Sequence, residues 1–291
     1  MSKLIVSPEV FLVGETQLLN DGVFDYLRAS GNEAFIATIN EARLYSNASD
    51  AQILCSMFAK LCYASLTLGK NDNLTRIRSI PDNFKSVLTT GHGSILEHIQ
   101  FNFIVHNCSR VLTHELIRHR VGTAFSQTSG RYVRSDQISL VLDPILNPVV
   151  NEIEAVLEFI EAKYAQMVEK LAVDQQDFHI KKKMTSALRR IMPNGQANEM
   201  AVSLNLRTLR HTILMRTAAG AEWEIREVFG QIYRIMKGRY PELFQDACER
   251  EVDGALEVYG MKMQPYEMAL DSYSEEELKS ALALKTVQKS M

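Results

Sequence analysis

The chain has few cysteines, and none of them is placed in a known cysteine motif. Only four of the 291 residues are cysteine, and Cys55, Cys62, Cys108 and Cys248 form no Cys-x-x-Cys pair and no zinc-finger spacing. Structural zinc sites use such closely spaced ligands, so the sequence argues against this class of metal site. Thiols without a disulfide pattern are typical of a reducing compartment, and we therefore expect a cytoplasmic protein.

Long hydrophobic runs are also missing. No apolar stretch reaches the roughly 18 residues that a membrane-spanning helix needs, and Pro8 and Glu9 interrupt the apolar N-terminus in a way that does not fit a signal peptide. We therefore expect no membrane partner. The hydrophobic content of 46% and the charged content of 23% are those of a globular protein. The formal net charge of −3 argues against a nucleic-acid partner, because bulk binding of nucleic acid requires a basic domain.

Common nucleotide and metal motifs are absent as well. The Gly91-His92-Gly93-Ser94 segment lacks the third glycine of a dinucleotide fingerprint, and the chain has no P-loop. A nucleotide cofactor would therefore depend on arginines and helix ends to hold its phosphates. Residues 114–117 resemble the start of a zinc-protease motif, but His119 falls one residue late for two imidazoles to share a helix face. We expect no metal site.

Two strongly basic segments lie in this slightly acidic chain. Residues 106–134 contain five arginines and one glutamate, and residues 181–216 contain eight lysines and arginines and one glutamate. Residues 241–279 have the opposite balance, with eleven acidic and three basic residues. A charge run is most often a solvated helix face. Here polar residues such as Gln127 and His211 are interspersed, which favours a site for an anionic ligand, because guanidinium groups bind phosphate and carboxylate oxygens.

The hydrophobic pattern indicates strands early in the chain and helices later. We expect strands within 3–13 and 99–106, a loop over 121–130 and a return to strand over 132–142. Strands followed by helices favour an α+β fold, with a mixed or antiparallel sheet flanked by helices, over a doubly wound sheet. The segments expected to be helical are 50–68, 81–91, a helix capped by Ser109, a helix from Val150, and 181–192, 197–216 and 221–238.

Three ordered blocks of sequence resemble the flavin-dependent thymidylate synthase family. Together they make the resemblance much more specific than any single motif, and it extends over residues 50–245. The blocks are GHGSILEH at 91–98; THELIRHR at 113–120 with FSQTSGRYV at 125–133; and NLRTLRH at 205–211 with LMR at 214–216 and AEWEIR at 221–226, preceded by Arg189 and Pro193.

One feature departs from the family signature. The family has seven residues between the Arg-His-Arg triplet and the serine, whereas this chain has eight, from Val121 to Thr128. The extra residue lies before Phe125, and Gly122 can absorb it as a bulge because glycine tolerates conformations that other residues avoid.

The resemblance implies an enzyme that methylates dUMP to dTMP. Methylenetetrahydrofolate would donate the carbon unit, and FAD reduced by NADPH would supply the hydride, with no cysteine nucleophile. The resemblance also implies a homotetramer whose active sites are shared between subunits. It implies a single domain of the flavin-dependent thymidylate synthase-like fold over 1–291, with 50–245 as the best-matching core and 246–291 as an acidic C-terminal extension.

The same resemblance assigns roles to individual residues. Arg216 is expected to be catalytic, because a permanent cation at the uracil edge stabilises the charge that develops on the ring. The residues implied to bind FAD are Ser94, Arg118, His119, Arg120, Gln127, Asn205, Arg207 and His211. Those implied to bind dUMP are Glu115, Arg118, Gln127, Thr128, Ser129, Gly130, Arg131, Arg189 and Arg216.

Two alternative functions remain open from the residues. One is a flavin enzyme of the same fold that acts on another pyrimidine nucleotide, which the inserted residue would favour if it reshapes the pocket. The other is a non-catalytic nucleotide-binding homologue that has kept the anion site. Flavin absorbance of the purified protein separates the enzymes from the last alternative, and a comparison of dUMP with dCMP and UMP separates the two enzymes.

Overall fold

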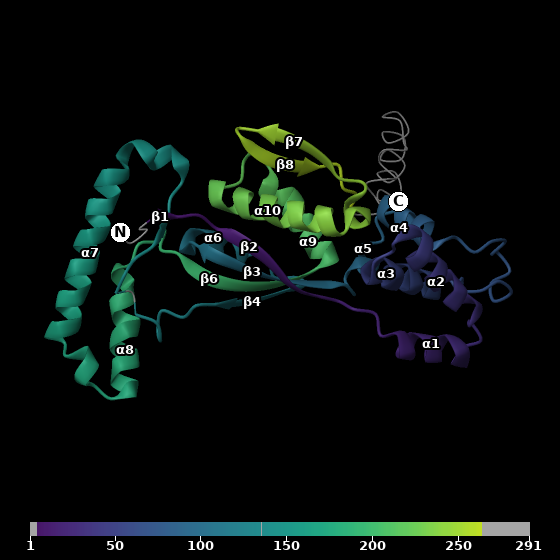
Figure 1. The fold of residues 1–291 in the computed structure, drawn as a ribbon, viewed down its shortest axis with the longest axis horizontal. Helices are drawn as coiled ribbons and strands as arrows, with labels where there is room; N and C mark the ends of the chain where they lie inside the picture. Colours follow the sequence, from purple (N-terminus) through teal and green to yellow (C-terminus); the bar gives the residue numbers. More distant parts are fainter. Residues whose placement is uncertain (1–4, 135, 264–291) are drawn as a thin grey trace, which may run out of the picture.

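A four-stranded antiparallel sheet forms the middle of the molecule (Figure 1). The computed structural model describes residues 5–134 and 136–263. The strand order is β2-β3-β6-β4, which confirms the prediction of an α+β fold with an antiparallel sheet. Its strands are β2 (Glu9–Glu15), β3 (Gln100–Cys108), β6 (Asn198–Asn205) and β4 (Thr123–Gln127). A separate parallel pair joins β1 (Ile5–Val6) to β5 (Leu140–Val141), and Pro8 lies between β1 and β2 in the segment 3–13 that was expected to form strands.

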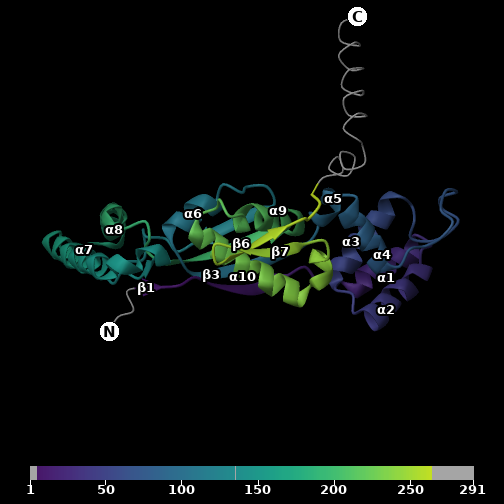
Figure 2. The same ribbon diagram turned by 90° about the horizontal axis from the view of Figure 1, so that it is seen from above.

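One face of the sheet is buried under two helices, α9 (Leu206–Thr217) and α10 (Trp223–Arg239), which lie side by side over it in both ribbon views (Figures 1 and 2). On β3 the residues Phe101, Phe103 and Val105 are buried among the core side chains of these helices. The alternation expected for 99–106 is therefore confirmed, because successive side chains of a strand point to opposite faces.

The opposite face of the sheet is more open. Ile104 of β3 is 38% exposed there, and Phe11 and Val13 of the edge strand β2 are 49% and 56% exposed. Among the described residues no helix covers this face (Figure 1).

A helical lobe with its own core lies at one end of the sheet (Figure 1). Helix α3 begins at Asp50 as expected, and Ser49 caps it, because its hydroxyl accepts a hydrogen bond from the backbone N–H of Gln52. The helix ends at Cys62 and not at Leu68, since Ala64 adopts a left-handed conformation with φ of 48°. The helices of the lobe are α1 (Asn20–Ala29), α2 (Ala34–Ser46), α3 (Asp50–Cys62), α4 (Ile80–Thr89) and the short α5 (Gly93–Leu96).

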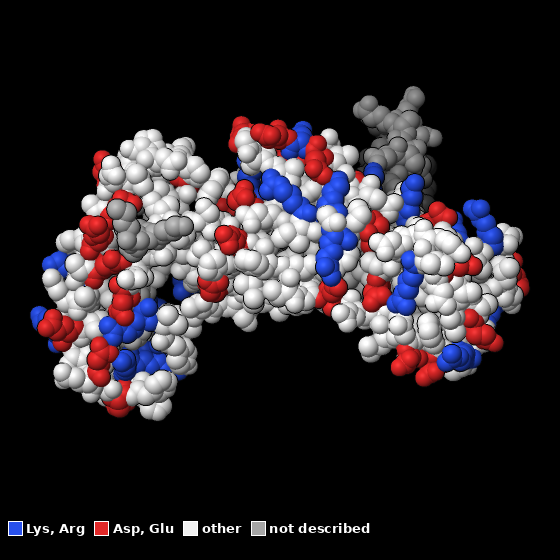
Figure 3. All heavy atoms as spheres, viewed as in Figure 1, with Lys and Arg blue, Asp and Glu red and all other residues white. Residues whose placement is uncertain are grey.

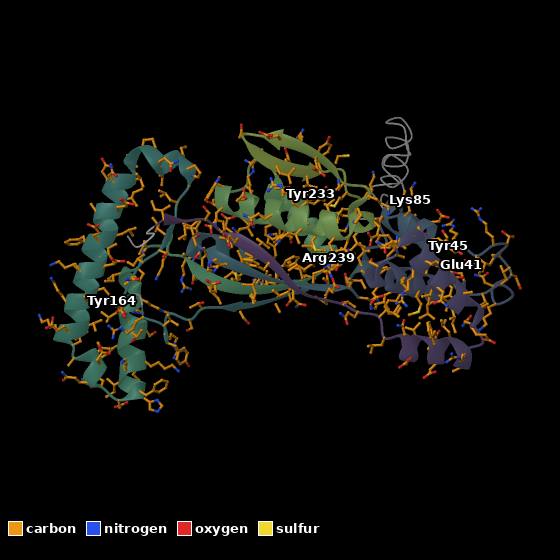
Figure 4. The ribbon with its side chains drawn as sticks, viewed as in Figure 1. Glu41, Tyr45, Lys85, Tyr164, Tyr233 and Arg239 are labelled. Atoms are coloured by element: carbon orange, nitrogen blue, oxygen red, sulfur yellow. The ribbon has the colours of Figure 1, made fainter. Side chains whose placement is uncertain are left out.

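A helical arm extends from the other end of the sheet (Figure 1). Tyr164, Val168 and Leu188 form a small core where its two long helices meet, with Tyr164 between them (Figure 4). Acidic side chains gather over α7 and basic side chains over α8 (Figure 3). The arm consists of η1 (Pro144–Val149), α7 (Val150–Lys170), η2 (Val173–Gln175), α8 (Phe178–Leu188) and η3 (Arg189–Ile191).

The start of the predicted acidic extension packs onto α9 and α10. It contains a hairpin of β7 (Cys248–Val252) and β8 (Ala255–Tyr259), preceded by η4 (Pro241–Phe244). Tyr233 of α10, labelled in Figure 4, donates a hydrogen bond to Glu249 of the hairpin at 2.8 Å. The buried guanidinium of Arg210 pairs with Asp246 at 2.6 Å. Residues 264–291 of the predicted extension lie outside the described residues.

The prediction of one helix over 197–216 is wrong in its first part. Residues 198–205 form β6, in which Met200, Val202 and Leu204 are buried while Glu199 and Ala201 are exposed. This period of two is that of a strand, and hydrogen bonds to β3 on one side and β4 on the other stabilise it.

Two predictions for 121–142 are also wrong. Residues 123–127 form the edge strand β4 where a loop was expected, because this polar segment pairs in register with β6. The strand expected over 132–142 is reduced to β5, which pairs with the short β1 and forms one isolated bridge from Leu140 to Gln196. Within the described residues, no helix combines the length and the apolar character needed to cross a membrane.

Candidate functional site

Helix α6 (Arg110–Leu116) is fixed at its beginning by a buried carboxylate. Ser109 caps the helix as predicted, with its hydroxyl accepting from the N–H of Leu112 at 3.1 Å. The N–H and the hydroxyl of Ser109 both donate to the carboxylate of Glu224 on α10. Burial raises the pKa of Glu224, and the bonds from Ser109 oppose that rise. The start of α6 is therefore held against α10, and Leu112 and Leu116 bury the rest of the helix against the main core.

Helix α9 begins at Asn205, whose side-chain oxygen accepts from the N–H of Thr208 at 2.8 Å. This is a standard N-cap, so the oxygen of Asn205 is already used in the structure of the helix. One turn apart along the helix, Arg207 and His211 share a face, and both line the same cavity. Arg216 lies in the last turn of the helix.

The guanidinium of Arg216 contacts a carboxylate and an imidazole at once. Its Nη1 lies 2.9 Å from Oε2 of Glu115, and its Nε lies 2.8 Å from Nε2 of His119. Its Nη2 also donates, at 3.4 Å, to the backbone carbonyl of Glu115. The structure thus brings together three of the residues that the sequence analysis singled out.

His119 lies in an environment that disfavours the imidazolium ion. Burial, followed by the charges of Arg216, His211 and Arg118, lowers the pKa of His119 to about 4. Its ring centroid is 6.4 Å from that of His211, with the two rings nearly edge to face. His119 is therefore neutral at physiological pH.

Next to Arg216 is a cavity of about 450 Å³, which we call the RHR cavity after Arg118, His119 and Arg120 in its wall. Arg207 pairs there with Glu97 at 2.6 Å. Arg118 and Arg120 have no carboxylate partner among the described residues, which leaves their charges available to an anion. The cavity is lined by Glu97, Arg118, His119, Arg120, Val121, Arg207, Thr208, His211 and Met263.

The segment 121–124, where the extra residue of the signature is expected, begins with a tight turn at the wall of this cavity. Gly122 has a φ of +69°, and its carbonyl accepts from the N–H of Asn205 at 2.9 Å. The hydroxyl of Thr208 donates to the carbonyl of Val121 at 2.7 Å. A Cβ atom at Gly122 would lie 2.1 Å from Nδ2 of Asn205. The turn therefore packs directly on the start of α9, and only glycine fits at its centre.

We expect Gly122→Ala to lower the free energy of unfolding by about 2 kcal/mol or more, because it combines a left-handed alanine with a displaced helix cap. Chemical denaturation followed by circular dichroism would measure the change. Gly220→Ala is the matched control, since a Cβ there meets no atom within 4 Å. Equal stability of the two variants would contradict the close packing of the turn.

A second polar cavity, of about 500 Å³, lies on the other side of α6. We call it the Arg189 cavity. Burial and the charge of Arg189 lower the pKa of Arg110, which shows how closely these cations approach each other. Arg110 and His114, one turn apart on α6, face this cavity, whereas Glu115 faces Arg216. The residues that line it include Arg110, His114, Thr128, Gly130, Arg134, Arg189, Arg190, Asn194 and Asn198.

Three further predicted residues, Gln127, Ser129 and Arg131, line neither of these two cavities. Gln127 ends β4 and donates to Thr113 at 3.2 Å and to Asn198 at 3.3 Å. The hydroxyl of Ser129 accepts from the N–H of Arg131 at 3.4 Å. The side chain of Arg131 lines a separate cavity of about 320 Å³ against α8.

Ser94 lies in the wall of another cavity, of about 470 Å³, in the helical lobe. It nevertheless follows Gly93, at which a Cβ would lie 2.7 Å from Nε of Arg207. Ser94 is therefore close to the RHR cavity along the chain, but it does not line it.

Several lining residues were given no role in the sequence analysis. Glu97, which pairs with Arg207, lies inside the block 91–98, so its position in that block was an available signal. Arg110 was counted among the arginines of the first basic segment, and the capping Ser109 before it placed it on the first turn of a helix. Asn198 carried no local signal, because only the pairing of β6 with its neighbouring strands brings it to the Arg189 cavity.

Comparisons with known proteins agree on one family. The model of the thymidylate synthase complementing protein family matches residues 43–242. A flavin-dependent thymidylate synthase of Nitratidesulfovibrio vulgaris is 33% identical over 171 residues, which cover 57% of this chain and 68% of the relative. The enzyme of the same name from Corynebacterium glutamicum is 32% identical over 227 residues, covering 75% and 87%. That from Geobacter sulfurreducens is 28% identical over 209 residues, covering 70% and 85%. The chain therefore belongs to the thymidylate synthase complementing protein family.

Proposed function

We propose that this protein is a flavin-dependent thymidylate synthase, which reductively methylates dUMP to dTMP with methylenetetrahydrofolate as carbon donor and FAD and NADPH as the source of hydride. The observation that carries the proposal is the guanidinium of Arg216, oriented by Glu115 and His119 beside the RHR cavity. A fixed cation at this place can stabilise negative charge that develops on a uracil ring.

The charges of the RHR cavity fit a flavin dinucleotide. Arg118 and Arg120 have no carboxylate partner among the described residues, and they suit the two negative charges of a pyrophosphate. In this proposal Arg118, His119, Arg120, Arg207 and His211 hold FAD, with Ser94, Asn205 and Gln127 at the edges of the site. Bound FAD would supply a hydride after reduction by NADPH.

The Arg189 cavity fits the phosphate of dUMP. Arg110, Arg189 and Arg190 converge there with Thr128 and Gly130. Phosphate oxygens bind guanidinium forks and backbone N–H groups well, and we place Thr128, Ser129, Gly130, Arg131 and Arg189 around the nucleotide. Glu115, Arg118, Gln127 and Arg216 would contact the nucleotide from the other side of the site.

The arrangement of the two cavities supports active sites that are shared between chains, and the proposed homotetramer takes its number of subunits from the family resemblance. The two cavities have no lining residue in common, and α6 stands between them. Asn198 and Asn205 lie at the two ends of β6, about 23 Å apart for a strand of this length. A nucleotide would place its phosphate in one cavity and its base at the cations of the other. Two chains, each contributing one of these cavities, would form such a binding site most simply. We propose that residues 1–291 of each chain form one domain.

The environment of the two buried thiols supports a mechanism without a cysteine nucleophile. Cys108 is fully buried, and burial together with Glu224 and Glu199 raises its pKa to about 12. Burial raises the pKa of Cys55 to about 12 as well. A thiolate is the reactive form of cysteine, so both thiols are poor nucleophiles.

Cys108→Ala is therefore expected to leave kcat unchanged within about twofold, because Cys108 acts as a small buried apolar residue. Steady-state turnover of the folded variant, checked by circular dichroism, measures this. A variant that folds but is inactive would point to covalent catalysis and against the proposed mechanism.

The proposed function is tested by mixing the reduced protein with dUMP and methylenetetrahydrofolate without oxygen and analysing the nucleotide products. Formation of dTMP supports the proposal. Methylation of dCMP or UMP in preference to dUMP would favour the other flavin enzyme of this fold. Protein that binds neither FAD nor NADPH, yet binds dUMP, would favour the non-catalytic homologue.

A further inference from the structure

The contact between Arg216 and His119 fixes which ring nitrogen of the imidazole carries the proton. A guanidinium has five N–H donors and no acceptor. The Nε–H of Arg216 donates to Nε2 of His119 at 2.8 Å, so Nε2 must present a lone pair. An imidazole with a lone pair on Nε2 is the neutral form that is protonated on Nδ1.

The charges around His119 agree with this neutral form. Arg216 and His211 face it from α9, and Arg118 and Arg120 flank it on its own turn. Glu115 lies at the end of α6 but is bonded to Arg216. Across the same cavity, the carboxylate of Glu97 is paired with Arg207. The surroundings of the ring are therefore cationic, and the pKa of His119 is lowered to about 4.

Two nitrogens of Arg216 are held by these contacts. Nη1 is bonded to the carboxylate of Glu115 at 2.9 Å and Nε to His119 at 2.8 Å. The contact of Nη2 with the carbonyl of Glu115 is the longest of the three, at 3.4 Å. Since two anchored nitrogens fix the plane of a guanidinium, the N–H groups of Nη2 point in a defined direction and are the ones most available to a ligand.

We propose that His119 is a positioning residue for Arg216: as a neutral hydrogen-bond acceptor opposite the carboxylate of Glu115, it holds the guanidinium in the orientation in which Nη2 meets the pyrimidine ring. The identity of the ring rests on the proposed function. This role differs from a contact with the flavin, because it acts through the side chain of Arg216.

This positioning role predicts that the guanidinium of Arg216 loses its fixed orientation at low pH. Protonation of His119 removes the acceptor and places a second cation against Arg216. Because the folded pKa is lowered from 6.5 to about 4, the neutral imidazole contributes fully to stability above pH 6.5. That contribution is lost as the pH falls toward 4. The pH profile of turnover should therefore have an acid limb, a fall in kcat at low pH, that is caused by protonation of His119.

Two substitutions separate positioning from a merely structural role. The side-chain oxygen of glutamine can accept a hydrogen bond near the place of Nε2 and does not titrate, whereas leucine cannot accept one. We expect His119→Leu to lower kcat about tenfold or more, since it removes a hydrogen bond to a charged group. His119→Gln should recover most of this loss and should lack the acid limb. His106→Leu, which removes an exposed imidazole paired with Glu199, is the control.

A double-mutant cycle tests whether His119 acts through Arg216. In the background of Arg216→Ala, His119→Leu should have little further effect on kcat, because the group that it positions is gone. The proposal is overturned if the two effects simply multiply, or if His119→Gln is as slow as His119→Leu at every pH.

Neutron diffraction of the holoenzyme at neutral pH tests the geometry without any assay of activity. The expected map has deuterium on Nδ1 of His119 and none on Nε2, and deuterium on Nε2 would overturn the proposal. If the map is as expected but dUMP is not methylated, the proposed function fails while the contact between His119 and Arg216 stands.

Discussion

Replacing Arg216 with alanine is expected to lower kcat about 10²–10³-fold, which is the usual cost of removing one preorganised donor from the charge that develops in a transition state. The side chain is partly buried between Glu115 and His119, so the variant loses a localised cation and not a core residue. Single-turnover formation of dTMP, measured with saturating dUMP, would report the chemical step.

Two further variants give this prediction a control. Arg216→Lys keeps the charge but cannot bond Glu115 and His119 at the same time, because an ammonium lacks the planar fork of a guanidinium; it should also be slow. Arg239→Ala removes an arginine that pairs with Glu15 on the surface, and it should leave kcat unchanged. Near-normal turnover of Arg216→Ala would show that the catalytic role has been assigned to the wrong residue.

Mixed assemblies of two inactive variants are expected to regain activity. Arg189 lines the Arg189 cavity, whereas Arg216 lies beside the RHR cavity, bonded to His119. In the proposed homotetramer one active site takes the two arginines from different chains. Random assembly of Arg189→Ala chains with Arg216→Ala chains would then leave about a quarter of the sites with both arginines intact. Co-expression with two affinity tags and purification on both would isolate the mixed assemblies.

The mixing experiment needs a control pair of variants whose two residues belong to the same site on the same chain. Arg118 and Arg216 both lower the pKa of His119, so they lie in one group on one chain and form the control pair that should not complement. Absence of recovery with Arg189→Ala and Arg216→Ala, in assemblies shown to contain both chains, would contradict shared sites. Light scattering that reports an active monomer would contradict them independently.

Local signals in the sequence were enough to place several helices. Ser49 and Ser109 begin helices as expected, because a hydroxyl that accepts from a backbone N–H two or three residues later is a property of the segment alone. The alternation along β3 was equally local. These features required no knowledge of the rest of the fold.

The strands β4 and β6 were missed because pairing between distant segments decides them. The apolar residues of β6 run on into those of α9, and the cap that separates the two is Asn205, which the sequence analysis treated as a ligand residue only. The polar segment 123–127 becomes a strand because it can pair with β6. Neither partner can be recognised from the segment itself.

The sequence singled out candidate residues, but it could not predict how they are arranged. The ordered blocks indicated Arg118, His119, Arg207 and His211, and these side chains do line one cavity. The sequence gives no distance between blocks, so it could not predict that Arg189 and Gly130 line a different cavity beyond α6. The hydrogen bond between Arg216 and His119 was likewise not foreseen, because it joins side chains 97 positions apart.

The helical arm ties part of the proposed substrate site to a small hydrophobic core. Arg189 follows directly on α8, and the four buried side chains that hold α8 to the rest of the arm are Tyr164, Val168, Val173 and Leu188. A unit with so small a core opens at a lower free energy than the sheet and its two covering helices. Amide hydrogen exchange should therefore be faster in α8 than in β6. Binding of a nucleotide phosphate at Arg189 should slow exchange in the arm, so part of the affinity for the nucleotide would be spent on holding the arm closed.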